Sequence, residues 1–378
     1  MSFSLPDLLK SSRSLMARLA KAPPIGLYFG RDTVNLVQME ETAQALRIRA
    51  ISALPLPNAR EALIRNPQAF KAVLKQARAT QPFSGNRVVS SLSSQEVKTS
   101  TVIYKRQKGM TDEQSLVAEL RERMPGELSE SVVDFMALRH ADPDVEVGEA
   151  LVAVAPRKNV LAYLDALNAA GLEVDSLDVG PNALARLVRH SGSQQWREFP
   201  KLPNALLINV GSHTTFLSVI WGRRLILDRP VDFSEHRLLA RLMKVLGMQE
   251  SLALLFLHDM EQTGPVAEET RRTALEVLRP EIQALQQEIN RTLVYMASKT
   301  RGKSVDVIFL AGGVARYPSL LKGFQQSLQV PVALLNPLSL FASGPAAATF
   351  DTSLGLRPGI VLASALALHG IAEQDPWT

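Results

Sequence analysis

Two short glycine turns hold the side chains in this sequence that are best suited to binding a ligand. The first is Gly30-Arg31-Asp32-Thr33, and the second is Gly211-Ser212-His213-Thr214. A glycine beside hydroxyl groups suits phosphate, because backbone N–H groups and hydroxyls then surround the anion without side-chain obstruction. One such turn is a weak indication, since most turns of this kind only reverse the chain. The occurrence of two strengthens the interpretation.

The two turns lie in matching surroundings. Residues 25–37 and 207–219 each read as an apolar strand, a glycine, three polar residues and a second apolar strand. The two glycines are about half the chain apart, which is typical of an internal duplication. The sequence therefore predicts an α/β protein with two similar lobes, each opening with a β-hairpin, and a cleft between them.

A third glycine motif, Phe309-Leu-Ala-Gly-Gly-Val-Ala315, follows a predicted strand in the second half. With the order of elements, it resembles the actin-like ATPase superfamily and, within it, the type IV pilus assembly protein PilM family, relatives of the cell-division protein FtsA. The two turns are similar to that family's phosphate loops, and residues 308–320 to its adenosine motif. Glu288-Ile-Asn-Arg291 is similar to the helix on the nucleoside side. The resemblance covers about residues 25–370.

The resemblance implies a bilobed actin-like fold, a duplicated ribonuclease H-like unit, with a small subdomain inserted in the first lobe. It also implies ATP as the cofactor. The residues that it places around the nucleotide are Gly30, Arg31, Asp32, Thr33, Gly211, Ser212, His213, Thr214, Glu288, Arg291, Gly312, Gly313 and Arg316.

The same resemblance divides the chain into parts. The expected boundaries are 1–24 for a basic amphipathic N-terminal segment, 25–93 and 148–200 for the first lobe, 94–147 for the inserted subdomain, 201–232 and 301–378 for the second lobe, and 233–300 for the helical small subdomain of the second lobe.

Three positions depart from the family pattern. Tyr28 and Asn209 stand where the two phosphate loops usually carry Asp, and Asn35 stands where a Lys usually follows the first loop. Mg²⁺ prefers carboxylate oxygens, so Tyr and Asn are poor substitutes. Losing a positioned base alone typically costs about 10²–10⁴ in rate. The sequence therefore predicts no catalytic residues, weak ATP binding at most, a poor Mg²⁺ site and no meaningful ATPase turnover.

Composition excludes several other chemistries. The 378 residues contain no cysteine, so disulfides, Cys-ligated metals and thiol nucleophiles are absent. The six histidines are scattered, without the i, i+4 pair of a zinc-binding helix, and we predict no metal site. The formal net charge is +5, but the basic residues are dispersed and aromatic residues make up 6%, so nucleic acid is not an expected partner.

Two functions remain as interpretations, with a sugar kinase of the same superfold a remote third. In the first, the chain is an assembly scaffold whose first lobe and inserted subdomain receive the N-terminal peptide of a PilN-like inner-membrane protein, as the resemblance implies. The strands expected near Val88–Leu92 and Glu96–Ile103 would offer edges for β-addition, and a proline at Ser100 would remove an outward donor. In the second, the chain is an ATP-binding actin-like switch.

The expected location follows from this interpretation. No segment has the roughly 20 apolar residues needed to span a bilayer, so we predict a cytoplasmic protein peripheral to the inner membrane. Residues 1–24 suit contact with acidic headgroups, with a frayed terminal helix as the alternative reading. The sequence leaves a homo-oligomer, and the pilus or secretion system that the protein serves, open.

Overall fold

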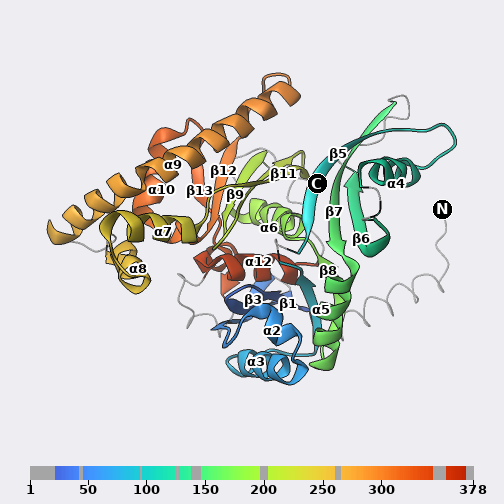
Figure 1. The fold of residues 1–378 in the computed structure, drawn as a ribbon, viewed down its shortest axis with the longest axis horizontal. Helices are drawn as coiled ribbons and strands as arrows, with labels where there is room; N and C mark the ends of the chain where they lie inside the picture. Colours follow the sequence, from blue (N-terminus) through green and yellow to red (C-terminus); the bar gives the residue numbers. More distant parts are fainter. Residues whose placement is uncertain are drawn as a thin grey trace, which may run out of the picture.

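The computed structural model describes residues 22–41, 46–93, 96–124, 126, 128–137, 146–195, 203–259, 265–343 and 355–371. The predicted N-terminal segment up to residue 21 therefore lies outside the described residues. The described chain forms two lobes and a third, smaller part (Figure 1). The first lobe lies at the bottom of the view, the second at the upper left, and the inserted subdomain at the upper right.

The first lobe is built on a six-stranded sheet with the order β14-β3-β2-β1-β4-β8. The strands β1, β2 and β3 form an antiparallel meander, whereas β4 and β8 continue the sheet parallel to β1. The strand bounds are Ile25–Phe29 for β1, Thr33–Glu41 for β2, Leu46–Pro55 for β3, Arg87–Ser91 for β4, Glu173–Asp178 for β8 and Ala342–Ser343 for β14.

The second lobe repeats this topology in a five-stranded sheet with the order β11-β10-β9-β12-β13. Here β9, β10 and β11 form the meander, and β12 and β13 run parallel to β9. The bounds are Ala205–Val210 for β9, Thr215–Trp221 for β10, Arg224–Val231 for β11, Val307–Gly312 for β12 and Val332–Leu334 for β13. The repeated strand order confirms the two similar lobes that the glycine hairpins predicted.

The inserted subdomain is a three-stranded antiparallel sheet with the order β5-β7-β6. It comprises β5 (Lys98–Lys105), α4 (Asp112–Arg123), the short η1 (Leu128–Glu130), β6 (Ser131–Ala137) and β7 (Val147–Pro156). The boundary expected at residue 147 is therefore too early. Strand β7 pairs with β5 and β6 over its whole length, so the subdomain continues to Pro156 before the chain returns to the first lobe.

The helices cover the faces of the two large sheets. The first lobe carries α2 (Arg60–Ile64), α3 (Pro67–Ala79), α5 (Arg157–Ala169) and α6 (Gly180–Gln195). Helices α7 (Glu235–Leu246), α8 (Glu250–Asp259) and α9 (Pro265–Lys299) occupy the range expected for the second small subdomain. The remaining elements are η2 (Gly313–Arg316), α10 (Pro318–Ser327), α11 (Pro337–Leu340) and α12 (Pro358–Ala367).

The end of the chain does not stay with the second lobe, contrary to the expectation for residues 301–378. Strand β14 pairs with β3 of the first sheet, and α12 packs against β1, β2 and α6 while also reaching β12. The contact with β1 depends on Gly26, because a Cβ there would lie 2.0 Å from the carbonyl oxygen of Ala363. Helix α12 is apolar on all sides since it is buried between the lobes.

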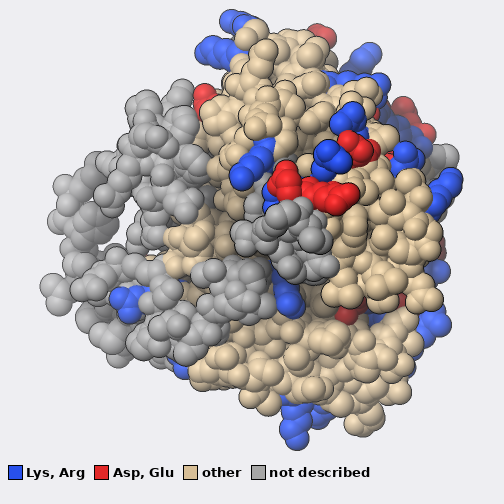
Figure 2. Space-filling view, turned by 90° about the vertical axis from the view of Figure 1, so that its left-hand side faces the viewer, with Lys and Arg blue, Asp and Glu red and all other residues tan. Residues whose placement is uncertain are grey.

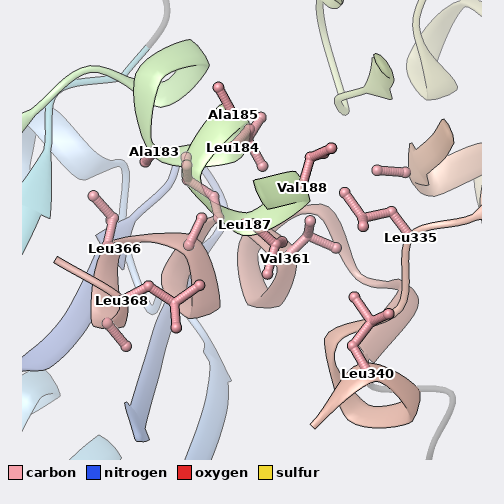
Figure 3. Close-up of a cluster of buried hydrophobic side chains, with 14 of the residues drawn as sticks. Ala183, Leu184, Ala185, Leu187, Val188, Leu335, Leu340, Val361, Leu366 and Leu368 are labelled. Atoms are coloured by element: carbon pink, nitrogen blue, oxygen red, sulfur yellow. The ribbon is translucent and has the colours of Figure 1, made fainter. Parts of the chain in front are cut away.

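The largest core cluster therefore belongs to both lobes. It contains side chains of α6 and α12 together with residues of both sheets. Figure 3 shows Leu187 and Val188 of α6 next to Val361 of α12. Since one continuous core joins the lobes at their base, the residues at the strand ends above it are held in a defined relative position.

The surface on the side of α8 is mixed in charge. Figure 2 looks onto this side, and Lys and Arg are spread over it, with Asp and Glu gathered near the middle. Leu252, Leu254 and Leu255 of α8 are 54%, 36% and 56% exposed. Helix α8 thus exposes three neighbouring leucines.

Candidate functional site

The two glycine turns have the same backbone geometry. The N–H of Gly30 donates to the carbonyl of Thr33 at 2.9 Å, and the N–H of Gly211 donates to the carbonyl of Thr214 at 3.0 Å. In the second turn a Cβ on the glycine would lie 2.6 Å from the Thr214 oxygen, closer than real Cβ contacts allow. Glycine is therefore required by the turn itself, which explains its presence without a ligand.

A cavity of about 410 Å³ lies between the turns. All eight residues of the two turns line it. Its other walls come from the first residues of α6 and α12, from the connection between β4 and β5, and from Glu235 at the start of α7. The two glycine turns, one from each lobe, and two helix N-termini thus converge on one space.

The three positions that depart from the family pattern all line this cavity or its base. Tyr28, Asn35 and Asn209 are among the lining residues. Asn35 is buried against Gly359 of α12, where a Cβ would come within 2.2 Å of the amide nitrogen. The Oδ1 of Asn209 is buried without a hydrogen-bond partner among the described residues. The strands beneath the turns therefore present a phenol and an amide at the two positions expected for carboxylates, and a second amide at the position expected for a lysine.

The chemistry of these side chains does not suit a metal. Burial raises the pKa of the Tyr28 hydroxyl above its usual value, so this group stays neutral at physiological pH. Within the described ranges, no group of three or more His, Asp or Glu side chains has the arrangement of a metal site. A Mg²⁺ ion held by this cavity would have to rely on neutral ligands from the strands, which bind it poorly.

Across the cavity, His213 of the second turn faces Asp32 of the first. The His213 Nε2 lies 3.9 Å from an Asp32 oxygen, and the ring lies 5.2 Å from that of His236. Burial, and then the charge of Arg31, lower the pKa of His213 below its ordinary value. The imidazole is therefore uncharged at neutral pH, and it does not supply a cation for a phosphate.

Four of the residues predicted on the nucleoside side, Glu288, Arg291, Gly312 and Gly313, are not among those that line this cavity. Gly312 ends β12, and Gly313 begins η2. Gly312 has φ of +88° and packs on β9, where a Cβ would lie 2.1 Å from the Val210 oxygen. A Cβ on Gly313 would lie 2.8 Å from the carboxyl group of Glu235. Gly312 is thus needed for packing, whereas a side chain at Gly313 would have to displace the Glu235 carboxyl group, the end of a flexible side chain.

Glu288 and Arg291 form an ion pair with each other on α9. The Glu288 carboxylate accepts a bond from Arg229 at 2.8 Å and also pairs with Arg291. Arg229 lowers the pKa of Glu288, which keeps the carboxylate ionised. These side chains therefore form a surface ion-pair group apart from the cavity. The side chain of Arg316, in η2, lies outside the described residues.

One residue that lines the cavity had no counterpart among the sequence predictions. Arg60, at the start of α2, is 1% exposed and donates from Nε to the carbonyl of Phe29 at 2.8 Å. Its Nη1 pairs with Glu96, and its guanidinium lies 5.0 Å from the ring centre of Tyr163. Arg60 thus ties the strand end that precedes the first turn to the connection that leads into the inserted subdomain. In the sequence it is one arginine among many.

A second unpredicted group joins the inserted subdomain to the second lobe. Asp228 on β11 is 3% exposed, and its two oxygens accept bonds from Ser218 at 2.6 Å and from Thr99 at 2.8 Å. Ser218 lies opposite Asp228 on β10, whereas Thr99 belongs to β5. A lone acid within an apolar strand is the sequence signal that would have drawn attention to it.

The buried carboxyl group predicts a pH-dependent stability. Burial raises the pKa of Asp228 to about 6 from an ordinary 3.8, so the folded protein favours the protonated acid. Its stabilising contribution is complete below about pH 4 and is lost as the pH rises through 6, by roughly 3 kcal/mol. We expect the free energy of unfolding, compared with that of Asp228→Asn at each pH in urea titrations, to fall over this range. A constant difference between pH 4 and 7 would contradict this.

The described helices include none that is long and apolar enough to cross a membrane.

Comparison with known proteins identifies relatives of this chain. A sequence family described as type IV pilus assembly protein PilM matches residues 26–370. Among solved structures, a PilM-PilN type IV pilus biogenesis complex is 23% identical with a TM-score of 0.70, over 93% of this chain and 99% of that chain. A glycerol dehydratase reactivase is 9% identical with a TM-score of 0.51, over 92% and 99% of the two chains. At these identities the likeness to solved structures concerns the fold.

Proposed function

Because the chain belongs to the type IV pilus assembly protein PilM family, we propose that it is an actin-like scaffold that does not hydrolyse ATP at a useful rate. In this proposal it works at the cytoplasmic face of the inner membrane, where it holds the N-terminal peptide of a PilN-like protein. The observation that supports the loss of hydrolysis most directly is the replacement of both loop carboxylates by Tyr28 and Asn209 at one cavity.

Charge at the cavity supports the same conclusion. Its acidic side chains, Asp32, Glu61 and Glu235, are offset by Arg31, Arg60 and Arg357. Of these acids, Glu235 is buried and accepts a bond from the Tyr317 hydroxyl at 3.3 Å. Of the cations, Arg60 is already paired with Glu96. The cavity therefore offers no excess of positive charge to replace Mg²⁺ around a triphosphate.

With ATP and Mg²⁺, we expect steady-state phosphate release at the background rate. Restoring both carboxylates in Tyr28→Asp/Asn209→Asp should make ATP binding depend on Mg²⁺, because carboxylate oxygens then face the cavity from both lobes. The matched control is Tyr28→Phe/Asn209→Ala, which changes the same positions without adding charge. Phosphate release by the unaltered chain well above background, and lost on adding a chelator, would favour the ATP-switch alternative.

The partner is proposed by similarity to a PilM-PilN complex, whose TM-score of 0.70 to this chain shows a shared fold. A strand edge that receives an extended peptide must lack a neighbour on one side. The edge expected near Val88–Leu92 does not meet this condition, because β4 lies between β1 and β8. Strand β5 does meet it, since it is the outer strand of the inserted sheet.

The direction of the backbone groups along β5 follows from two hydrogen bonds. The N–H of Arg106, just after β5, donates to the carbonyl of Glu146 just before β7, at 2.8 Å. The carbonyl of Ile103 instead accepts from the Arg123 side chain at 3.0 Å. Backbone N–H and C=O groups alternate in direction along an antiparallel strand, and the β5–β7 register has no shift. The backbone groups of odd-numbered β5 residues therefore point away from β7, and those of even-numbered residues point toward β7.

This alternation corrects the expectation for Ser100. Its side chain is exposed, but its N–H points toward β7, so a proline there would break the interior of the sheet. The outward groups that a peptide can reach include those of Thr101. The Ile103 carbonyl is already engaged by Arg123 of α4. The peptide edge in this proposal is therefore the part of β5 before Ile103.

A further inference from the structure

We propose that Asp228 and Thr99 position the inserted sheet against the second lobe, and that this contact sets the edge to which the peptide partner binds. The part of the proposal that concerns the peptide rests on the function proposed above. The part that concerns the position of the sheet stands on the structure alone.

The contact crosses from one part of the fold to another. Thr99 lies at the start of β5 in the inserted sheet, and its Oγ1 donates to Asp228 Oδ2 on β11, the outer strand of the second lobe's sheet. The other oxygen, Oδ1, is held by Ser218 within the second lobe. Strand β11 packs against β5 and also against β7. One carboxyl group therefore connects the second lobe to the sheet that carries the proposed edge.

The group is costly to keep, which argues for a role. Burying a carboxylate without a cation carries a large desolvation penalty, and two hydroxyl donors offset only part of it. Losing the Thr99 hydroxyl leaves one oxygen of a buried acid unpaired. The free energy of the protein is then lower when the sheet moves away and water reaches this oxygen.

The position of Thr99 connects this contact to the peptide edge. Thr99 and Thr101 are both odd-numbered residues of β5, so their backbone groups point to the same, outer side. Their side chains point together to the sheet face opposite α4, because side chains two residues apart share a face. A shift of Thr99 relative to β11 therefore carries the outward groups of Thr101 with it. Thr99 and Ser218 also line the cavity between the turns.

The absence of cysteine in the native chain allows a direct test by distance measurement. Spin labels are attached at Glu122→Cys on α4 and Lys322→Cys on α10, both exposed positions, and the distance distribution is recorded by pulsed electron paramagnetic resonance. In this background Thr99→Val removes the hydroxyl at nearly constant volume, and Thr99→Ser keeps it. We expect the distribution to shift or broaden in Thr99→Val and to match the parent in Thr99→Ser.

Asp228→Asn provides a second variant, since its amide keeps two hydrogen-bonding positions without the buried charge. We expect it to retain the parent distribution. An unchanged distribution in a folded Thr99→Val protein overturns the positioning role. An equal shift in Thr99→Ser also overturns it, because the effect would then not depend on the hydroxyl.

The peptide arm uses the synthetic N-terminal peptide of the PilN-like protein and the same variants. We expect its dissociation constant to rise about fivefold or more in Thr99→Val and to recover in Thr99→Ser, with the thermal midpoint close to that of the parent. A shifted distance distribution with unchanged affinity supports the positioning of the sheet but contradicts a peptide site on β5. If the parent chain does not bind the peptide, the proposed function is contradicted. The spin-label distances still test whether Thr99 positions the inserted sheet.

Discussion

Replacing Thr101 by proline is expected to weaken binding of the partner peptide at least about tenfold. A proline has no N–H, and the N–H of Thr101 points outward in the open part of β5. Losing one backbone hydrogen bond to a docked strand, together with the steric bulk of the ring at the edge, costs more than 1.4 kcal/mol, which is a factor of ten in affinity. Fluorescence anisotropy of a labelled peptide measures the change.

Two matched variants separate the edge from other effects. Thr101→Ala removes the side chain and keeps the N–H, so it should bind the peptide almost as the native chain does. Ser100→Pro places the ring where the N–H faces β7, so its main effect should be a lower thermal midpoint. If Thr101→Pro is folded and binds with unchanged affinity, the peptide does not add to β5.

Arg60→Met is expected to lower the free energy of unfolding by about 3–5 kcal/mol. The substitution keeps an unbranched chain of similar length but removes the bond to the Phe29 carbonyl and leaves Glu96 without its cation. Removing one partner of a buried pair is costly because the other charge stays behind. Stacking of the guanidinium on Tyr163 is lost as well. Urea unfolding followed by circular dichroism measures the effect.

The conservative variant indicates which part of the contact matters. Arg60→Lys keeps a positive charge for Glu96 but has no planar group to bond Phe29 and cover Tyr163 together. We expect an intermediate loss for Arg60→Lys. A loss below about 1 kcal/mol for Arg60→Met would mean that the site behaves as an exposed ion pair, and that Arg60 does not hold the strand end before the first turn.

The fold was predictable because its two halves carry the same local signal. An apolar strand, a glycine and a second apolar strand require a hairpin, and the repetition of this pattern after Gly30 and Gly211 indicates the duplication. The boundaries were less predictable. Strand β7 reads as any buried strand, and only its pairing with β5 and β6 assigns it to the inserted subdomain. The position of α12 likewise depends on long-range packing against Gly26.

Part of the candidate site could be predicted because it lies in the two hairpins that the local sequence pattern indicates. The turn residues could be found from local pattern, and the structure brings them together at one cavity. Glu288 and Arg291 were placed by resemblance, and in the structure they engage Arg229 and each other. Arg60 and Asp228 could not be assigned a role from the sequence, because their partners are far away in the chain.

In the proposed function, this chain holds its partner as a scaffold and not as a nucleotide-driven switch. Calorimetric titration of the full chain with the N-terminal peptide of the PilN-like protein, with and without ATP and Mg²⁺, distinguishes the two. We expect saturable one-to-one binding with the same dissociation constant in both buffers and no continuing heat of hydrolysis. Binding that requires ATP, or steady heat release once peptide and Mg²⁺-ATP are both present, would contradict it.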